Sequence, residues 1–171
     1  MTNYTTEETP TVTYTPTLKG ASGIKALHQF YKTSFLQGRP PSMRLRLLSR
    51  TIGANRVVDE IYVAFKHTQE MPWILPGLQP TDRQVEIVLV SIVTLRGGKL
   101  CSEHIYWDQA SVLVQVGLID CNSVPKQAKG ITALPIAGRE AVKKILLYDK
   151  EQSTAPETAS MEAQVDGSDI H

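Results

Sequence analysis

A strand-like segment at residues 99–108 carries three side chains that can exchange protons or form hydrogen bonds. Because the side chains of a strand alternate between its two faces, His104, Tyr106 and Asp108 are expected on one face. A carboxylate in apolar surroundings has a raised pKa and can serve as a base, and a histidine beside it can pass the proton on. The opposite face of the segment carries Glu103, Ile105 and Trp107.

A second segment, residues 56–68, adds further candidates to the same expected pocket. One of its faces is apolar apart from Asp59 near one end and His67 near the other, with Phe65 between them. A curved sheet with these polar groups on an otherwise apolar inner face is typical of a small-molecule pocket. Such a set of side chains is suited to removing a proton next to a carbonyl group, which needs no cofactor.

These residues also have structural interpretations, which stay open at this stage. Asp108 ends a strand directly before an expected helix, where aspartate commonly caps the helix N-terminus. Asp59 can pair with an arginine of the neighbouring strand. A lone histidine on an apolar strand is often a structural residue, and this applies to His67 and His104.

Aromatic residues of the expected pocket have a structural alternative as well. Tyr14 and Tyr106 fit a position in the core with the hydroxyl group in water. Trp73 lies in a loop rich in proline and glycine, residues 71–80, where it can anchor the loop, contact the substrate, or do both.

The elements that must position these residues form an α+β pattern, with helices before and after a run of strands. The Gly97-Gly98 pair predicts a tight hairpin turn, and long strands joined by short turns indicate an antiparallel sheet. Ser22 is expected to cap the first helix and Gly38 to follow its end. Strands are expected at 11–17, 43–52, 56–68, 83–95 and 99–108, and helices at 22–35, 109–118 and 135–148.

Length and composition indicate one domain. The chain has 171 residues, of which 42% are hydrophobic and 20% charged. Residues 11–148 are expected to form the domain, whereas residues 1–10 and 149–171 are polar and expected to be disordered. The strand at 83–95 is almost wholly apolar, which suggests burial on both sides and hence a homodimer.

Charge and motif content exclude several classes of function. A net charge of +1 gives no electrostatic reason to expect nucleic-acid or membrane partners. No Cys or His pair has zinc-ligand spacing, and there is no Gly-rich phosphate loop, so we expect neither a metal nor a cofactor. Without a signal peptide or an apolar span, and with Cys101 and Cys121 outside any disulfide pattern, a cytoplasmic location is expected.

A series of short motifs in the second half of the chain carries a family resemblance. In order they are His67-Thr68, Glu70, Pro80-Thr81-Asp82, Gly98-Lys99, Glu103-His104, Asp108 and Gln115-Val116-Gly117. This order resembles the SnoaL-like polyketide cyclase family of the nuclear-transport-factor-2-like superfamily. The stretch TYTPTLKGASGIKALHQFYKTSF also resembles the entry strand and helix of one subgroup, so the resemblance covers residues 11–148.

The resemblance implies a cone-shaped α+β fold, in which a curved antiparallel or mixed sheet wraps around helices and encloses a deep pocket. It also implies frequent dimerisation through the outer face of the sheet. Family members catalyse aldol ring closures, and relatives carry out isomerisations, dehydrations, lactone chemistry or epoxide opening. Their usual base is an aspartate late in the sheet, so that role falls to Asp108, with His67 and His104 as proton partners or oxyanion donors.

The chain departs from the family pattern at three places. The helices that usually precede the first strand and close the pocket are replaced by about ten residues. We therefore expect an open pocket, a pocket covered by a partner subunit, or a misplaced start codon. Tyr14 stands where relatives often have histidine, and Asp82 replaces a loop glycine.

Two functions remain open. The first is a cofactor-independent cyclase or isomerase acting on an apolar, polyketide-like intermediate of secondary metabolism, with a dehydratase or a lactone or epoxide hydrolase as variants. The second is a non-catalytic small-molecule-binding or dimerisation module. Convergence of the three expected catalytic residues in a pocket would favour the enzyme. We expect catalysis from Asp108, His104 and His67, and substrate binding from Asp59, Tyr14, Tyr106, Trp73 and Phe65.

Overall fold

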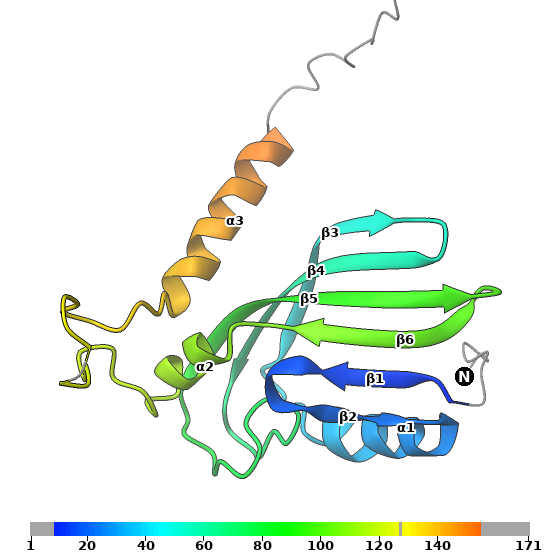
Figure 1. Ribbon diagram of the computed structural model, residues 1–171, viewed down its shortest axis with the longest axis horizontal. Coiled ribbons are helices and arrows are strands. Elements are labelled where there is room, and N and C mark those ends of the chain that lie inside the picture. Colours follow the sequence, from blue (N-terminus) through cyan, green and yellow to red (C-terminus); the bar gives the residue numbers. More distant parts are fainter. Residues whose placement is uncertain (1–8, 127, 155–171) are drawn as a thin grey trace, which may run out of the picture.

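The structure is a computed structural model that describes residues 9–126 and 128–154, and it is built on a curled, unclosed six-stranded sheet (Figure 1). The strands lie in the order β2-β1-β6-β5-β4-β3. Neighbours run antiparallel, except that β1 and β6 are parallel. Their bounds are β1 (Thr11–Tyr14), β2 (Lys19–Ser22), β3 (Arg44–Ile52), β4 (Arg56–Lys66), β5 (Gln84–Arg96) and β6 (Lys99–Tyr106).

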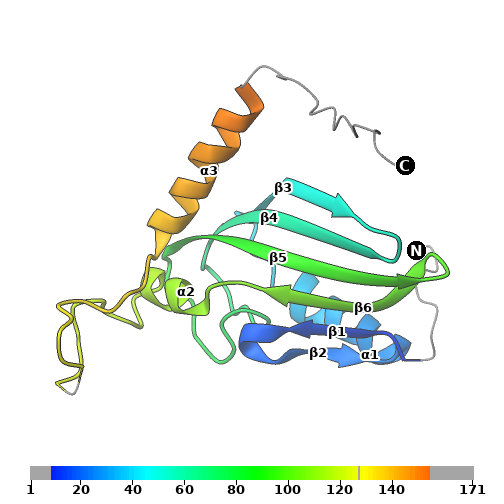
Figure 2. The same ribbon diagram turned by 45° about the horizontal axis from the view of Figure 1, so that its top comes forward.

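Helices flank this sheet in chain order, as the sequence pattern predicts. Helix α1 (Ile24–Phe30) continues directly into a π-helical segment, η2 (Tyr31–Leu36), and both lie beside the β1–β2 hairpin (Figure 2). Helix α2 (Gln109–Gln115) follows β6. Helix α3 (Arg139–Thr154) starts beside β5 and reaches β3, where Asp149 pairs with Arg46 at 3.0 Å.

The register of the long β5–β6 hairpin decides which side chains face the interior. Its turn residues, Gly97 and Gly98, have φ values of 57° and 76°, which glycine adopts without strain. Ser91 lies opposite Ile105, and Val93 lies opposite Glu103. Up to the register shift between Thr94 and Leu95, odd-numbered residues of both strands therefore share the concave face, and even-numbered residues share the convex face.

The hydrophobic core fills the concave face. Alternate residues of β5, beginning with Val85 and Ile87, are buried against α1 and the loop around Trp73. Even-numbered residues of β5, such as Val88, Val90 and Ile92, are only partly buried. The expected burial of this strand on both sides is thus incomplete in the single chain.

Several element boundaries differ from the sequence-based expectation. Strand β2 was not expected, and its pairing with β1 takes Ser22 into the strand, so the N-cap position of α1 falls on Gly23, which makes no side-chain cap bond. The pairing requires glycine at position 20, where a Cβ atom would lie 1.9 Å from the carbonyl oxygen of Val12. Residues 15–17 form a 3₁₀ turn, η1 (Thr15–Thr17), instead of continuing the first strand.

At the C-terminal end, α3 continues to Thr154, beyond the expected helix end at residue 148. The expected disorder of residues 1–8 and 155–171 falls outside the described residues. Among the helices that are described, none is both long and apolar enough to cross a membrane.

Candidate functional site

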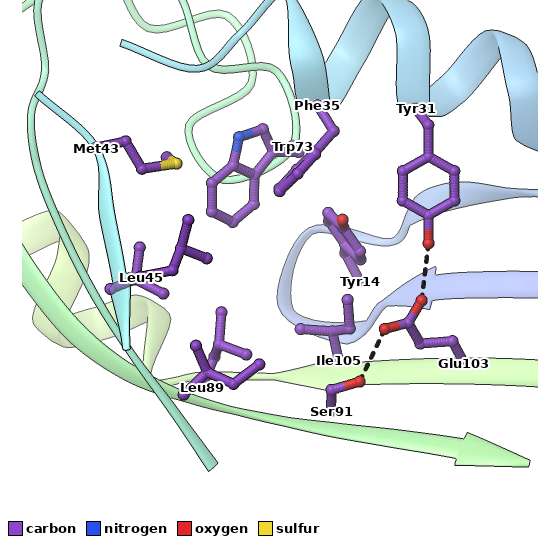
Figure 3. Close-up of a pocket in the computed structure, with 12 residues that line it drawn as sticks. Tyr14, Tyr31, Phe35, Met43, Leu45, Trp73, Leu89, Ser91, Glu103 and Ile105 are labelled. Atoms are coloured by element: carbon purple, nitrogen blue, oxygen red, sulfur yellow. Dashed lines mark hydrogen bonds between the residues drawn. The ribbon is translucent and has the colours of Figure 1, made fainter. Parts of the chain in front are cut away.

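A pocket of about 230 Å³ lies on the concave face of the sheet, beside α1, η2 and the loop that carries Trp73 (Figure 3). Its walls are almost entirely apolar or aromatic, and the carboxylate of Glu103 is the only charged group among its lining side chains. The lining residues are Tyr14, Tyr31, Phe35, Met43, Leu45, Ile61, Val63, Trp73, Leu89, Ser91, Glu103 and Ile105.

Glu103 is held by two hydroxyl groups from opposite sides of the pocket. The Tyr31 hydroxyl donates to Glu103 Oε2 at 2.7 Å, and the Ser91 hydroxyl donates to Oε1 at 2.8 Å. Figure 3 shows the carboxylate between these two groups. Hydrogen bonds to an ionised acceptor are roughly twice as strong as neutral ones, so the pair fixes the orientation of the carboxylate.

Local structure explains how these three residues meet. Glu103 and Ser91 belong to the inward-facing rows of β6 and β5. Tyr31 is the first residue of η2, and Phe35 of the same segment also lines the pocket. The π-helical geometry is rare and is frequent at functional sites.

The electrostatics of the pocket are dominated by Glu103. Among the described residues, Glu103 forms no ion pair with a lysine, arginine or histidine. Burial, and then the charge of Glu103, raise the pKa of Tyr14. Burial, and then the charge of and hydrogen bond to Glu103, raise the pKa of Tyr31. Both phenols therefore stay protonated at neutral pH and act as hydrogen-bond donors.

An aromatic cluster forms the floor of the pocket. The ring of Tyr14 makes edge contacts with Phe30, Trp73 and Trp107 at centroid distances of 5.3, 5.7 and 6.0 Å. Phe35 contacts Trp73 at 5.6 Å. These contacts keep Tyr14 in place, and no described residue accepts a hydrogen bond from its hydroxyl. Tyr14 and Trp73 thus line the pocket, and their expected role in substrate binding stays a prediction.

The expected catalytic residue Asp108 lies outside this pocket. Its Oδ1 accepts a hydrogen bond from the backbone N–H of Ser111 at 3.0 Å, and its Oδ2 accepts one from the Ser111 hydroxyl at 2.5 Å. The Ser111 hydroxyl oxygen in turn accepts from the N–H of Gly138. Asp108 therefore caps α2 and ties it to the segment that leads into α3, which is the structural alternative that the sequence left open.

His104 and Tyr106 point away from the pocket as well. Both side chains are exposed on the convex face of the sheet, and their rings contact each other at a centroid distance of 6.5 Å. The expectation that they face an inner pocket with Asp108 is wrong, because the register turns the opposite row, Glu103 and Ile105, inward.

His67 is fully buried but does not line the pocket. Its Nδ1 accepts the backbone N–H of Thr81 at 3.2 Å, and its backbone N–H and C=O bond to Arg83 and Asp82. Burial lowers the pKa of His67, an effect that the charge of Asp82 partly offsets. His67 is therefore a neutral residue that closes the loop between β4 and β5.

Two residues that were expected to bind the substrate, Asp59 and Phe65, instead form contacts within the protein. Asp59 makes a bidentate ion pair with Arg50 of the neighbouring strand, with both N–O distances at 2.7 Å. Phe65 is completely buried in the core and does not line the pocket. Three polar residues that do line it, Glu103, Tyr31 and Ser91, were not expected. The available signal was that Glu103 shares a strand face with Ile105 and Trp107, the more apolar face of residues 99–108.

The described residues contain no group of three or more His, Cys, Asp or Glu side chains that could hold a metal ion. The pocket itself contains one carboxylate, that of Glu103, which two hydroxyl groups orient. Beside it lies the phenol of Tyr14, whose hydroxyl is available to a ligand.

Comparison with known proteins gives similarity at the level of structure. No protein-family model matches the sequence, and no curated protein matches it significantly. A candidate SnoaL-like polyketide cyclase from Jannaschia sp. CCS1 is similar with a TM-score of 0.56 and 16% identity, over 68% of this chain and 76% of that chain.

Two further solved structures are similar over a comparable length. AclR, a candidate hydroxylase from Streptomyces galilaeus, has a TM-score of 0.52 and 19% identity, over 68% of this chain and 80% of that chain. A candidate polyketide cyclase from Acidithiobacillus ferrooxidans has a TM-score of 0.50 and 17% identity, over 67% and 78%. At these identities the similarity is one of fold.

Proposed function

We propose, on the premise that the chain has the SnoaL-like fold, that it is a cofactor-independent isomerase or cyclase that uses acid–base catalysis at Glu103. One observation carries this proposal: an otherwise apolar pocket contains a single carboxylate, which the hydroxyls of Tyr31 and Ser91 hold in place. A positioned carboxylate of this kind is a common general base. The names of the similar structures support small-molecule chemistry, and the assignment of the base rests on the pocket.

In the proposed mechanism Glu103 takes a proton from the substrate and returns it at another atom. Each carboxylate oxygen has two lone pairs, so one on each oxygen stays available beside the bonds from Tyr31 and Ser91. The Tyr14 hydroxyl donates a hydrogen bond to a polar atom of the substrate. Because the proton that Glu103 gains is given back, the net result is a rearrangement that consumes no co-reactant.

The size of the pocket limits the substrate. About 230 Å³ is below the range of about 300–1,000 Å³ that is typical of pockets for drug-sized ligands. We therefore narrow the expected polyketide-like intermediate to a small, mostly apolar molecule about the size of one substituted ring. The aromatic cluster around Tyr14 and Trp73 leaves little room for a larger body.

The proposal is tested by metabolite profiling of a strain that lacks the gene, complemented with variants. Glu103→Gln keeps the shape of the side chain but removes the proton acceptor, so this strain should accumulate the same intermediate as the deletion strain. Glu60→Gln is a matched control, because Glu60 lies on the outer face and bonds to Ser49. Normal profiles from the Glu103→Gln strain would refute the proposal.

A second candidate is a non-catalytic binding module of the same fold. It is favoured by one observation: none of the three residues expected to be catalytic lines the pocket. A module would bind a small molecule in the pocket, but the deletion strain would then accumulate no unconverted intermediate.

A further inference from the structure

The charge balance of the pocket indicates what kind of ligand it binds. Glu103 has no cationic partner among the described residues, and only neutral hydroxyl groups contact its carboxylate. Arg50, a cation on the same concave face, is bound on two nitrogen atoms by Asp59. The negative charge at the pocket wall is thus uncompensated, and such a charge in apolar surroundings is unfavourable until it is paired.

The aromatic side chains of the pocket walls also favour a cationic ligand. Tyr14, Tyr31, Phe35 and Trp73 make up a third of the twelve residues that line the pocket. Aromatic rings attract cations through their quadrupole, and the effect is largest for tryptophan and in desolvated sites. An anionic ligand, in contrast, would meet the charge of Glu103 without any lysine or arginine in the lining to offset it.

We infer that the pocket binds a small organic cation, such as a protonated amine on a single aromatic or alicyclic ring, with its N–H groups on Glu103 and its ring among the aromatic side chains. This inference rests on the proposed function for the location of the site. The two are chemically consistent: proton transfer from a cationic substrate to Glu103 neutralises both charges, which apolar surroundings favour. With a neutral substrate the same step would only move the negative charge onto the substrate.

Three probes of matched shape test the inference: 2-phenylethylamine, 2-phenylethanol and phenylacetate, which are cationic, neutral and anionic at pH 7. Binding is measured by the change in tryptophan fluorescence. Trp73 lines the pocket, and the ring centroid of Trp107 lies 5.9 Å from that of Trp73. We expect the amine to bind about tenfold more tightly than the alcohol, and phenylacetate to bind most weakly. Equal affinity for the amine and the alcohol, tighter binding of phenylacetate, or no binding of any probe would overturn the inference.

Variants connect the preference to the carboxylate. In Glu103→Gln the preference for the amine should disappear while the affinity for the alcohol is retained. In Glu60→Gln, which removes a carboxylate from the outer face, the preference should persist. A preference that survives in Glu103→Gln would overturn the inference.

The two proposals fail in distinguishable ways. If Glu103→Gln fails to complement the deletion strain but the amine is not preferred, the catalytic proposal stands and the inference about charge is wrong. If the amine is preferred through Glu103 but Glu103→Gln complements fully, the pocket is a cation-binding site and the catalytic proposal is wrong.

Discussion

The hydroxyl of Tyr31, at the start of the π-helical segment η2, donates a 2.7 Å hydrogen bond to the carboxylate of Glu103 on β6. The bond joins two elements that are 72 residues apart in the sequence and lie on opposite walls of the pocket. It therefore links the geometry of the proposed base to the packing of α1 and η2 on the sheet.

Removal of this bond should lower stability. Tyr31→Phe keeps the ring contacts with Phe30 and Phe35 but leaves Glu103 with one hydrogen-bond donor fewer. We expect the free energy of unfolding in urea to fall by about 1.5–3 kcal/mol, since hydrogen bonds to charged groups contribute in this range. Tyr148→Phe, at an exposed position of α3, should have no effect. Equal stability of Tyr31→Phe and the unmodified protein would show that the bond contributes little.

The raised pKa of Tyr31 and Tyr14 predicts a loss of stability at alkaline pH. Their pKa lies above the ordinary value of 10.0 in the folded state, so above pH 10 the unfolded chain releases protons that the folded chain retains. The stability that these neutral phenols contribute is thus complete below pH 10 and is lost as the pH rises further. Urea unfolding between pH 8 and 11 should show this decline, with a shallower slope for Tyr31→Phe. An identical slope for the variant would contradict the assignment.

The buried His67 predicts a loss of stability at acidic pH, in contrast to the two tyrosines. Burial lowers its pKa below the ordinary 6.5, so below this pH the unfolded chain binds a proton that the folded chain does not. Stability should therefore decrease as the pH falls through 6.5. In His67→Gln, compared at pH 7.5 and 5.5, the pH-dependent part of this loss should be smaller. His104→Gln is the matched control, since that side chain is exposed on the outer face. An unchanged pH dependence in His67→Gln would contradict the account.

We propose that the protein forms a homodimer through the outer face of the sheet. Val88, Val90 and Ile92 of β5 are only partly buried there, and Ile145 and Leu147 of α3 are exposed. Apolar surface of this kind is typical of interfaces. Sedimentation at micromolar concentration should show a dimer, and Val90→Glu should shift it to the monomer. A monomeric unmodified protein would refute the proposal.

The fold class could be predicted from the sequence because it depends on features of short range. The apolar run of β5 and the Gly97-Gly98 turn define the β5–β6 hairpin almost to the residue. Strand β2 could not be predicted, because only four residues, Lys19–Ser22, form it and their pairing with β1 supplies the stabilisation. The similarity to SnoaL-like structures confirms the expected fold.

The candidate site was harder to predict, because it depends on which face of β6 turns inward. Both faces of residues 99–108 carry a group that can act as an acid or a base, Glu103 on one and His104 with Asp108 on the other. The apolar neighbours Ile105 and Trp107 favour the face of Glu103, which is the face that the structure turns inward. Tyr31 could not be assigned to the pocket, since its position depends on the π-helical turn.

Two substitutions of Asp108 test its structural role as the cap of α2. Asp108→Asn should retain the cap of α2, because asparagine caps about as well as aspartate, whereas Asp108→Ala should lose about 1 kcal/mol of stability. Thermal unfolding of the two variants measures this difference. If Asp108→Ala were as stable as the unmodified protein, the cap would not explain why aspartate stands here.

The most direct test of the central claim is the rate at which purified variants convert the intermediate that accumulates in the deletion strain. Loss of a general base typically lowers the rate by about 10²- to 10⁴-fold. We expect a loss of this size in a folded Glu103→Gln protein and a rate near that of the unmodified protein in Asp108→Asn. Near-normal turnover by Glu103→Gln, with a large loss in Asp108→Asn, would contradict the account and return the catalytic role to Asp108.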